Sequence, residues 1–342
     1  MGIIVNTRSL LNPLTGVQRY LSEILKNTNT EIETLEPPRA WASGIRGHAW
    51  EQIILPTKIK KNQLLWSPTN TGPLGVKKQV VSIMDFTTIE HPEWFNRNYA
   101  LLYKYLLPRI VKKSLHVLTI SEYTKERIMA ITGINPDKIT VTPLAADTRF
   151  EVKERVEVQR VKNKYDINNE YILTLGSLEP RKNLTKLFDA WVNWDFRPRE
   201  LSLVVAGGTG KVFKNLGFDK IPKNVELIGR VDDVDLPGLY SGAKFFIYPS
   251  LYEGFGLPVI EAMSCGTPVI TSNVTSLPEV VGSAGILIDP FDSKSIMEGM
   301  HQLYSDDMLR NKLSVDGLLR AELFSWSKTA EATFNVLNDF SN

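Results

Sequence analysis

Short runs of β-branched and other apolar residues alternate with longer amphipathic stretches along the 342-residue chain. In the first half this pattern predicts strands over 3–6, 63–67, 80–84, 117–120 and 138–141, and helices over 16–26, 98–113 and 122–131. The second half restarts the pattern, with strands predicted over 171–175, 201–206, 225–228, 245–248 and 268–271. Such alternation is typical of α/β proteins in which helices cover a mostly parallel sheet.

The length and one break in the pattern predict two domains. Domains usually span about 100–200 residues, so this chain has room for two hydrophobic cores. Residues 151–169 are highly charged and carry no strand pattern, so they are interpreted as a linker between an N-terminal domain (1–150) and a second domain (170–325). A last helical run begins at Trp326. It either completes the second domain or, as we expect for 326–342, packs back on the first.

Composition narrows the class of protein. A single cysteine, Cys265, excludes a disulfide framework and a cysteine-rich zinc site. No stretch reaches the roughly 18 apolar residues of a membrane span, and the N-terminus is interpreted as a first strand rather than a signal peptide. The sequence therefore predicts a cytoplasmic enzyme.

Charge is distributed unevenly along the chain. Residues 1–150 hold 19 Lys and Arg against 12 Asp and Glu, and the remainder holds 21 against 26. A basic half is typical of proteins with an anionic partner, but it also arises from unequal solvated faces. Both interpretations stay open at this point.

The most informative segment runs from Phe245 to Thr271 and has the pattern strand, glycine loop, helix, strand. Pro258 suits a first helical position and Gly266 a left-handed stop, which predicts a helix over 258–265. A helix N-terminus preceded by Gly254 and Gly256 favours phosphate binding. Glu253 and Glu261 would repel a bare phosphate, so they are expected to face hydroxyl groups, as on a sugar and a ribose.

Two further segments combine a strand end with a turn. Gly176 ends the strand 171–175, and Arg181 and Lys182 follow at the sheet edge where open α/β sheets bind ligands. Fixed cations there could neutralise a diphosphate leaving group, although a solvated Arg-Lys pair is the commoner case. After the first strand, Gly16 begins a helix pattern, a weaker signal that also fits a plain turn.

Together these segments resemble glycosyltransferase family 4, the retaining nucleotide-sugar transferases of GT-B fold. The segment EGFGLPVIE at 253–261 resembles the Glu-x7-Glu motif of that family, LEPRKN at 178–183 its diphosphate-binding segment, and TGVQRY at 15–20 its N-terminal glycine loop. The pattern is most similar to the mannosyltransferase-like branch that builds bacterial surface polysaccharides. The resemblance implies two Rossmann-like domains with parallel sheets that face an interdomain cleft.

The resemblance also implies roles for individual residues. Arg181 and Lys182 would hold the donor diphosphate, and Glu253 would contact the transferred sugar; these three are the expected catalytic residues. Donor binding would further involve Glu261 at the ribose and Gly16 near the phosphate. The base would lie near Arg230 and Val231. The other expected donor-binding positions are Gly176 at the strand end and the loop residues Gly254, Phe255, Gly256 and Leu257.

Two positions depart from the family pattern. Many relatives carry His-Asp after the third strand, whereas this chain has Met84-Asp85. Asp85 and His91 are the expected residues on the acceptor side, although His91 and His116 also fit structural roles. The usual Gly-Arg is Gly176-Ser177, which leaves Arg181 as the nearest guanidinium group.

A metal site is not expected. Asp232 and Asp233 precede a helix pattern, where caps are commoner than metal ligands. The cofactor prediction is therefore none, with a nucleotide diphosphate sugar as co-substrate.

The resemblance implies retaining transfer of a hexosyl group, with GDP-mannose the leading donor, to a lipid-linked glycan in O-antigen, lipopolysaccharide or capsule biosynthesis. A catalytically inert sugar-binding subunit and a GT-B-type sugar-nucleotide epimerase are the alternatives. No nucleic-acid partner is expected. The basic, aromatic segment 99–113 predicts peripheral attachment to the inner face of the cytoplasmic membrane. The alternative is an ordinary core helix whose basic face is exposed to solvent.

Overall fold

The computed structural model describes residues 2–12, 16–28, 30–176, 179–207 and 221–341. Backbone contacts divide the chain into two compact units. Unit 1 comprises Met1–Leu144 and Ser325–Asn342, and unit 2 comprises Ala145–Phe324.

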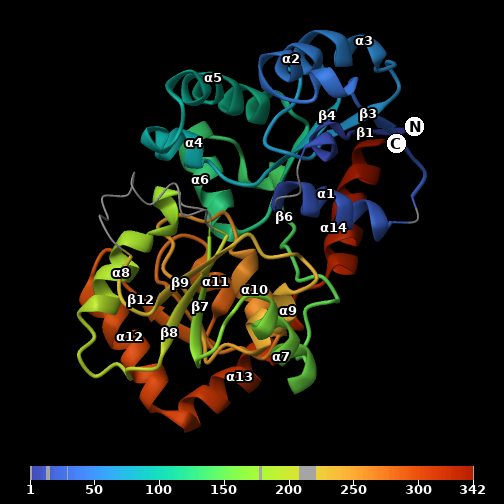
Figure 1. The fold of residues 1–342 in the computed structure, drawn as a ribbon. Coiled ribbons are helices and arrows are strands. Elements are labelled where there is room, and N and C mark those ends of the chain that lie inside the picture. Colours follow the sequence, from blue (N-terminus) through green and yellow to red (C-terminus); the bar gives the residue numbers. More distant parts are fainter. Residues whose placement is uncertain (1, 13–15, 29, 177–178, 208–220, 342) are drawn as a thin grey trace. The chain divides into compact units, whose positions relative to one another are not determined.

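Unit 1 is built on a parallel sheet with the strand order β2-β1-β3-β4-β5-β6 (Figure 1). Its strands are β1 (Ile3–Asn6), β2 (Ile32–Leu35), β3 (Leu64–Ser67), β4 (Gln79–Ile83), β5 (His116–Thr119) and β6 (Ile139–Val141). Its helices are α1 (Gly16–Lys26), α2 (Gly44–Ala49), α3 (Leu55–Lys58), α4 (Thr87–Glu90), α5 (Arg97–Lys113), α6 (Glu122–Thr132) and α14 (Trp326–Ser341).

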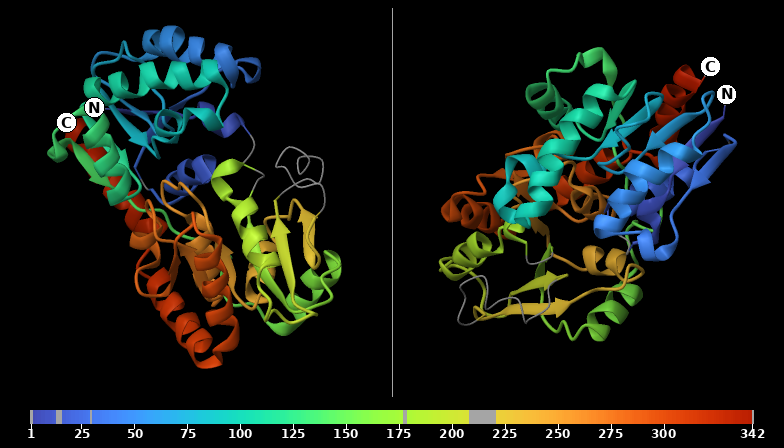
Figure 2. Two further views of the ribbon diagram at one scale, coloured as in Figure 1. Left: turned by 90° about the vertical axis from the view of Figure 1, so that its left-hand side faces the viewer. Right: turned by 90° about the horizontal axis from the view of Figure 1, so that it is seen from above.

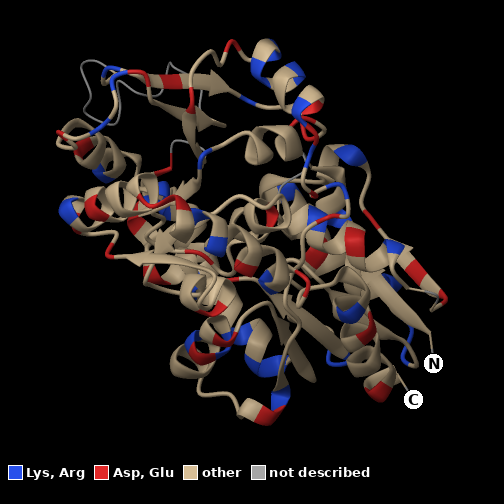
Figure 3. Cartoon of the chain, turned by 90° about the horizontal axis from the view of Figure 1, so that it is seen from below, with Lys and Arg blue, Asp and Glu red and all other residues tan. Residues whose placement is uncertain are grey.

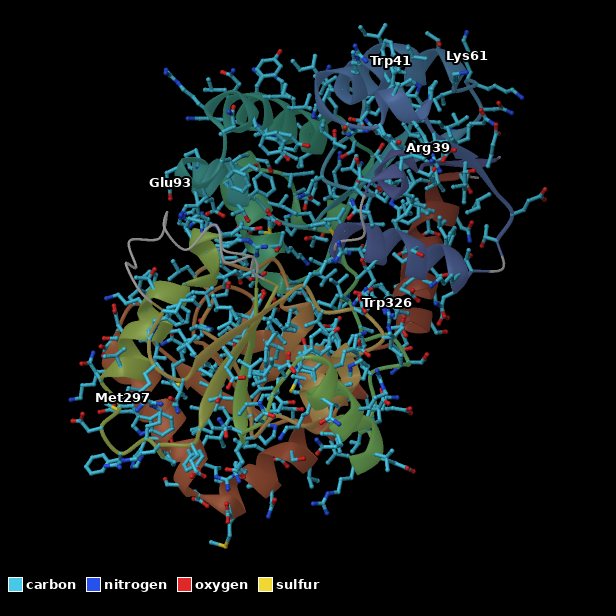
Figure 4. The ribbon with its side chains drawn as sticks, viewed as in Figure 1. Arg39, Trp41, Lys61, Glu93, Met297 and Trp326 are labelled. Atoms are coloured by element: carbon cyan, nitrogen blue, oxygen red, sulfur yellow. The ribbon has the colours of Figure 1, made fainter. Side chains whose placement is uncertain are left out.

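Both faces of the unit 1 sheet are covered by other elements. Successive side chains of β3 point to opposite faces, so neighbouring residues show what packs on each one. Leu65 packs with Ile4 and Leu55 on one face. Trp66, on the other face, makes an edge contact with Phe334 of α14 at 6.1 Å. The last helix, which begins at Trp326 (Figure 4), therefore contributes to the core of unit 1.

Unit 2 has a second parallel sheet with the order β12-β11-β10-β7-β8-β9. Its strands are β7 (Tyr171–Leu175), β8 (Ser202–Ala206), β9 (Val225–Gly229), β10 (Phe246–Tyr248), β11 (Val269–Ser272) and β12 (Gly285–Ile288). Its helices are α7 (Arg155–Lys164), α8 (Leu184–Val192), α9 (Leu236–Ser241), α10 (Leu257–Ser264), α11 (Leu277–Val281), α12 (Ser293–Ser305) and α13 (Asp307–Ala321). Figure 2 shows helices on both faces of each sheet, and Figure 3 shows the charged residues mainly on helices and loops.

The predicted α/β class with two parallel sheets is confirmed, and the predicted strands lie within a residue or two of the observed ones. The prediction omitted β2 and β12, which are both edge strands. Their side chains are partly exposed and β2 includes Glu33, so neither strand has the fully apolar run of a central parallel strand.

The predicted linker over 151–169 is wrong. This segment contains α7, which belongs to unit 2 and packs on α9. Among its ten residues only Val161 is buried, and Val158 is half-buried beside Gly242. A helix with three valines among charged and polar residues carries too little apolar surface to be distinguished from a charged loop.

No helix within the described residues is both long enough and apolar enough to cross a bilayer.

Candidate functional site

The site in unit 2 lies where the strand order of its sheet reverses. The crossover connections run from β7 outward through β8 to β9, and then from β10 in the opposite direction. Such a reversal leaves an open crevice at the carboxyl ends of the two central strands, which is where α/β sheets bind ligands. The segments that follow β7 and β10 carry Arg181, Lys182 and Glu253.

These three residues form one buried ionic cluster. The Arg181 Nη1 donates to Glu253 Oε2 at 2.9 Å, and the Lys182 Nζ donates to Glu253 Oε1 at 2.7 Å. Lys182 is 9% exposed and Glu253 is 8% exposed. The predicted site residues from two distant segments are thus in direct contact, and one carboxylate bridges both cations.

Two hydroxyl groups complete the coordination of the Glu253 carboxylate. Tyr248, the last residue of β10, donates to Oε1 at 2.7 Å, and Ser250 donates to the same oxygen at 2.6 Å. Sequence analysis did not select either residue. Tyr248 ends β10 and Ser250 follows it, and β10 is one of the two strands at the reversal of strand order. This position in the sequence could have indicated both residues.

The electrostatics of the cluster favour the ionised carboxylate. Burial alone would raise the pKa of Glu253, but Lys182 and Arg181 outweigh it and lower the pKa to about 2. Burial lowers the pKa of Lys182, against the attraction of Glu253. Arg181 also pairs with the half-exposed Glu179 at 2.6 Å. The cluster therefore holds two fixed cations against one buried carboxylate, and the second carboxylate, that of Glu179, is half exposed to solvent.

This ion pairing predicts a specific acid sensitivity. The pKa of Glu253 is depressed in the folded state, so its stabilising contribution is complete above about pH 4.5 and is lost as the pH falls toward 2. The difference between these two values corresponds to about 3 kcal/mol. Urea unfolding of the native protein and of Glu253→Gln should give free energies that converge between pH 4.5 and 2. Parallel curves over that range would contradict the assignment.

Glycines shape the backbone around the cluster. Gly256 has a φ of 108°, and a Cβ atom there would lie 2.6 Å from Leu277 Cδ2. A Cβ atom at Gly176 would lie 2.9 Å from Lys182 Cγ. Both glycines are thus required by close packing within unit 2, and Gly176 lets the Lys182 stem pass beside the end of β7.

Glu261 lies on α10, the helix that follows the glycine loop. It is 4% exposed, and its Oε2 accepts a hydrogen bond from Tyr240 at 3.1 Å. Tyr240 is a buried residue of α9, so this bond connects the two helices. The helix begins at Leu257, one residue before the predicted start, and Phe255 is buried against Phe324. The ribose-binding role of Glu261 stays a prediction.

The loop after β9 places Arg230 at the surface and buries Val231. The predicted capping position of Asp232 and Asp233 is wrong, because α9 begins at Leu236 and its N-cap residue is Asp235. Asp232 instead pairs with Lys164 at 2.7 Å, and Asp233 lies 3.9 Å from Arg149.

Asp235, which sequence analysis did not select, is the buried member of this group. Its carboxylate accepts hydrogen bonds from three side chains of or next to α7, those of Arg160, Lys164 and Tyr165. The run of acidic residues therefore anchors α7. Among the described residues, no group of three or more His, Cys, Asp or Glu is arranged to hold a metal ion.

The residues predicted on the acceptor side lie in unit 1. Asp85 Oδ1 accepts from the Thr87 N–H at 2.9 Å, at the start of α4. His91 Nδ1 lies 3.0 Å from Glu93 Oε1, and its ring stacks on Trp94 at 4.0 Å; Figure 4 labels Glu93. These contacts give Asp85 and His91 structural partners, and their acceptor role stays a prediction.

Met84 and His116 are part of the core of unit 1. Met84 is 4% exposed, and its backbone N–H donates to Asn70 Oδ1. His116 Nε2 is paired with Thr140 Oγ1 at 2.8 Å, and burial lowers the pKa of this histidine. A structural role accounts for both side chains.

Gly16 begins α1, and a Cβ atom there would meet no described atom within 4 Å. The packing of the described residues therefore does not itself require glycine at this position. Residues 13–15 of the preceding loop and residues 177–178 of the 173–183 segment lie outside the described residues.

Comparison with known proteins assigns the chain to a family. Residues 156–317 match the family described as glycosyl transferases group 1. The chain is 32% identical to O-antigen chain mannosyltransferase B of Escherichia coli, over 98% of this chain and 99% of that protein. This chain belongs to the group 1 glycosyl transferases. It is therefore a glycosyltransferase, as the sequence motifs predicted.

Solved structures confirm the fold of this glycosyltransferase. It is similar to sucrose-phosphate synthase of Thermosynechococcus elongatus, with a TM-score of 0.76, 16% identity and 99% coverage of both chains. It is also similar to Anabaena HepE, solved with UDP-glucose, with a TM-score of 0.75, 16% identity, and 99% and 100% coverage. At this level of identity the likeness shows the GT-B fold alone.

Proposed function

We propose that this glycosyltransferase moves a mannosyl group from GDP-mannose to a growing lipid-linked glycan in bacterial surface-polysaccharide biosynthesis, with the anomeric configuration retained. The carrying observation is the near full-length similarity to an O-antigen chain mannosyltransferase. The buried cluster of Arg181, Lys182 and Glu253 at the strand reversal supports it, because this arrangement suits a sugar diphosphate.

The cluster supplies three functions for the donor. The guanidinium and ammonium groups of Arg181 and Lys182 stabilise the departing diphosphate, whose negative charge grows as the sugar–oxygen bond breaks. The carboxylate of Glu253 contacts hydroxyl groups of the transferred sugar and favours its positively charged, flattened transition state. Catalysis rests on this electrostatic stabilisation and on orientation of the acceptor hydroxyl group. Glu261, Gly16 and the loops at 230–231 and 254–257 bind the remainder of the donor.

The proposal is tested by incubating purified protein with GDP-mannose, with and without a lipid-linked oligosaccharide acceptor. Mannose incorporated only with acceptor, and an anomeric NMR signal matching the donor configuration, are the expected results. Free GDP with a rearranged sugar and no acceptor requirement would identify an epimerase. Donor binding without turnover would identify an inert subunit. Transfer from UDP-glucose but not from GDP-mannose would overturn the donor assignment.

We expect transfer to be independent of divalent metal ions. Arg181 and Lys182 are fixed cations in the crevice and can neutralise the diphosphate as a bound ion does in other transferases. Initial rates should be unchanged in excess EDTA. A rate abolished by the chelator and restored by Mg²⁺ or Mn²⁺ would contradict this expectation and direct attention to Asp232 and Asp233.

We also propose that unit 1 attaches to an anionic membrane surface through α5. This helix buries Leu106, Leu107 and Ile110 but leaves Leu101 56% and Tyr105 54% exposed. Basic residues flank these exposed side chains, namely Arg97, Lys104, Arg109, Lys112 and Lys113. The guanidinium of Arg109 lies 3.6 Å over the Tyr105 ring. An apolar strip beside cations is typical of helices that lie in a membrane interface.

The expected result is salt-sensitive flotation with vesicles of phosphatidylglycerol and phosphatidylethanolamine. Each basic residue near the surface contributes about 1 kcal/mol, so raising the salt concentration should release the protein. Leu101→Ser combined with Tyr105→Ser should weaken flotation, whereas Ile45→Ser, an exposed apolar change on α2, should not. No flotation of the native protein at low salt would remove the proposal.

A further inference from the structure

The hydroxyl group of Tyr248 connects two members of the ionic cluster in unit 2. It is hydrogen-bonded to Nζ of Lys182 and to Oε1 of Glu253, the latter at 2.7 Å. An ammonium group can only donate, so the hydroxyl oxygen accepts from Lys182 and its single proton goes to Glu253. Burial and the neighbouring Glu253 raise the pKa of Tyr248 well above its usual range, so this proton stays on the tyrosine at neutral pH. Tyr248 is therefore a permanent donor to the carboxylate.

Ser250 carries the second hydroxyl group at this oxygen, but its proton is shared. Its Oγ lies 2.6 Å from Glu253 Oε1 and 3.0 Å from the carbonyl oxygen of Arg181, and one proton serves both acceptors. Among the residues that the structure describes, the proton of Tyr248 has Glu253 as its one acceptor. Tyr248 is thus the neutral donor committed to this carboxylate.

The two oxygens of Glu253 differ in the number of hydrogen bonds that they already accept. Oε1 is bonded to Lys182, Tyr248 and Ser250. Oε2 accepts from Arg181 alone within the described part of the chain. A carboxylate has about two acceptor positions on each oxygen, so Oε1 is saturated and Oε2 can accept one more bond. A sugar hydroxyl group that donates to Glu253 would therefore bond Oε2.

The orientation of this carboxylate depends on its donors. The last torsion of a glutamate side chain has a broad energy profile, so rotamer preference alone does not fix the plane of the carboxylate. Tyr248 is itself held firmly, because it is 1% exposed and its backbone carbonyl accepts a hydrogen bond from Thr271 of β11 at 3.0 Å. Its ring lies 5.6 Å from that of Phe246 on the same strand. The sheet thus fixes the hydroxyl group, and the hydroxyl group fixes the carboxylate.

We propose that Tyr248 is a positioning residue for the transfer reaction, whose hydroxyl group holds Oε1 of Glu253 beside Lys182 and leaves Oε2 for a hydroxyl group of the transferred sugar. Tyr248 acts through Glu253 and does not itself touch the donor. This inference rests on the proposed function, because it requires the sugar contact assigned to Glu253. Without the tyrosine hydroxyl group the carboxylate can rotate, and its contact with the sugar is weakened where positive charge develops.

Tyr248→Phe tests this role, because it removes the hydroxyl group and keeps the buried ring. We expect kcat to fall about 10-fold, as for the loss of one hydrogen bond, with the donor KM changed less than about 3-fold. Tyr171→Phe is the matched control. Tyr171 is a buried tyrosine of β7 whose hydroxyl group donates to the Leu239 carbonyl at 2.7 Å. The control should lower the Tm by a similar amount and leave kcat unchanged.

A double variant shows whether Tyr248 acts through Glu253. Glu253→Gln already removes the charge that Tyr248 positions, so adding Tyr248→Phe should lower kcat less than about 3-fold further. A further loss of about 10-fold would show that the two residues act independently, and the inference would then be wrong.

An equilibrium measurement checks the contact without turnover. A hydroxyl group that donates to an ionised carboxylate lowers the pKa of that carboxylate, so Tyr248→Phe should raise the pKa of Glu253 above its native value of about 2. In urea unfolding, the stabilising contribution of Glu253 should then be lost at a higher pH than in the native protein. Tyr171→Phe should follow the native pH profile. A native profile for Tyr248→Phe would contradict the inference.

The outcomes distinguish this inference from the proposed function. A native kcat for Tyr248→Phe, with Glu253→Gln impaired, overturns the inference alone. A native kcat for both variants removes the sugar contact of Glu253 from the proposed function, and the inference falls with it. If GDP-mannose does not react but another nucleotide sugar shows the expected loss in Tyr248→Phe, the donor assignment is wrong and the role of Tyr248 is supported.

Discussion

Glu253→Gln is expected to lower kcat about 10²-fold or more, the size typical of losing one preorganised charge at a transition state. The substitution keeps the size of the side chain and most of its hydrogen bonds, but it removes the negative charge. That charge favours a sugar ring that becomes positively charged as the diphosphate departs. The effect should therefore be larger on kcat than on the donor KM.

The geometry adds a second consequence of the same substitution. The Glu253 carboxylate accepts bonds from Arg181 and Lys182, so the amide leaves two cations without their shared anion. Breaking a buried ion pair from one side typically costs about 3–5 kcal/mol. We therefore expect a lower Tm, partly restored by GDP, whose diphosphate supplies the missing negative charge. Kinetics are to be measured on the folded fraction below the transition.

Glu261→Gln provides the comparison for Glu253→Gln. An amide oxygen can still accept the hydrogen bond from Tyr240, so the fold should tolerate the change. Since a ribose contact is equal in the ground state and the transition state, the donor KM should rise with kcat nearly unchanged. If both variants change only the donor KM relative to the native protein, the transition-state role assigned to Glu253 is wrong. A lower Tm with normal kinetics for Glu253→Gln would give that residue a structural role only.

The sequence was sufficient to predict the central strands and the sheet edge that carries the cluster. Buried parallel strands such as β7 and β10 are continuous apolar runs, and the polar residues after them necessarily lie at one edge of the sheet. The direct contact between Lys182 and Glu253 was not predictable, because these residues are 71 positions apart and pairing depends on strand order. The sequence assigned Lys182 to the diphosphate and Glu253 to the sugar, and it did not predict the hydrogen bond between them.

The incorrect predictions have a common physical cause. The helix α7 has three apolar residues, all valine, among ten, and the charged and polar remainder resembles a linker. Without a predicted helix at α7, there was no reason to pair Arg160 and Lys164 with the acidic residues at 232–235. Asp232 and Asp233 were therefore interpreted as helix caps.

Lys182→Met should reduce kcat/KM about 10³-fold, since it removes one of the two cations assigned to the leaving group. The methionine retains the unbranched stem that passes Gly176. The variant leaves Glu253 with Arg181 and two hydroxyl groups, so the pKa of this carboxylate should rise and stability should fall. Lys186→Met, a partly exposed change in α8, is the control and should have little effect on either quantity.

Combining Lys182→Met with Glu253→Gln separates the structural role of the ion pair from its catalytic role. Glu253→Gln leaves the buried Lys182 without its carboxylate, whereas the double variant removes both members of that pair and leaves Arg181 paired with Glu179. We therefore expect the double variant to have a higher Tm than Glu253→Gln, with a coupling energy of about 1–3 kcal/mol. Its activity should stay at the level of the weaker single variant, because neither the leaving-group cation nor the sugar-facing anion has been restored. Activity that recovers together with stability would show that the single variants fail through misfolding, and both catalytic assignments would then be wrong.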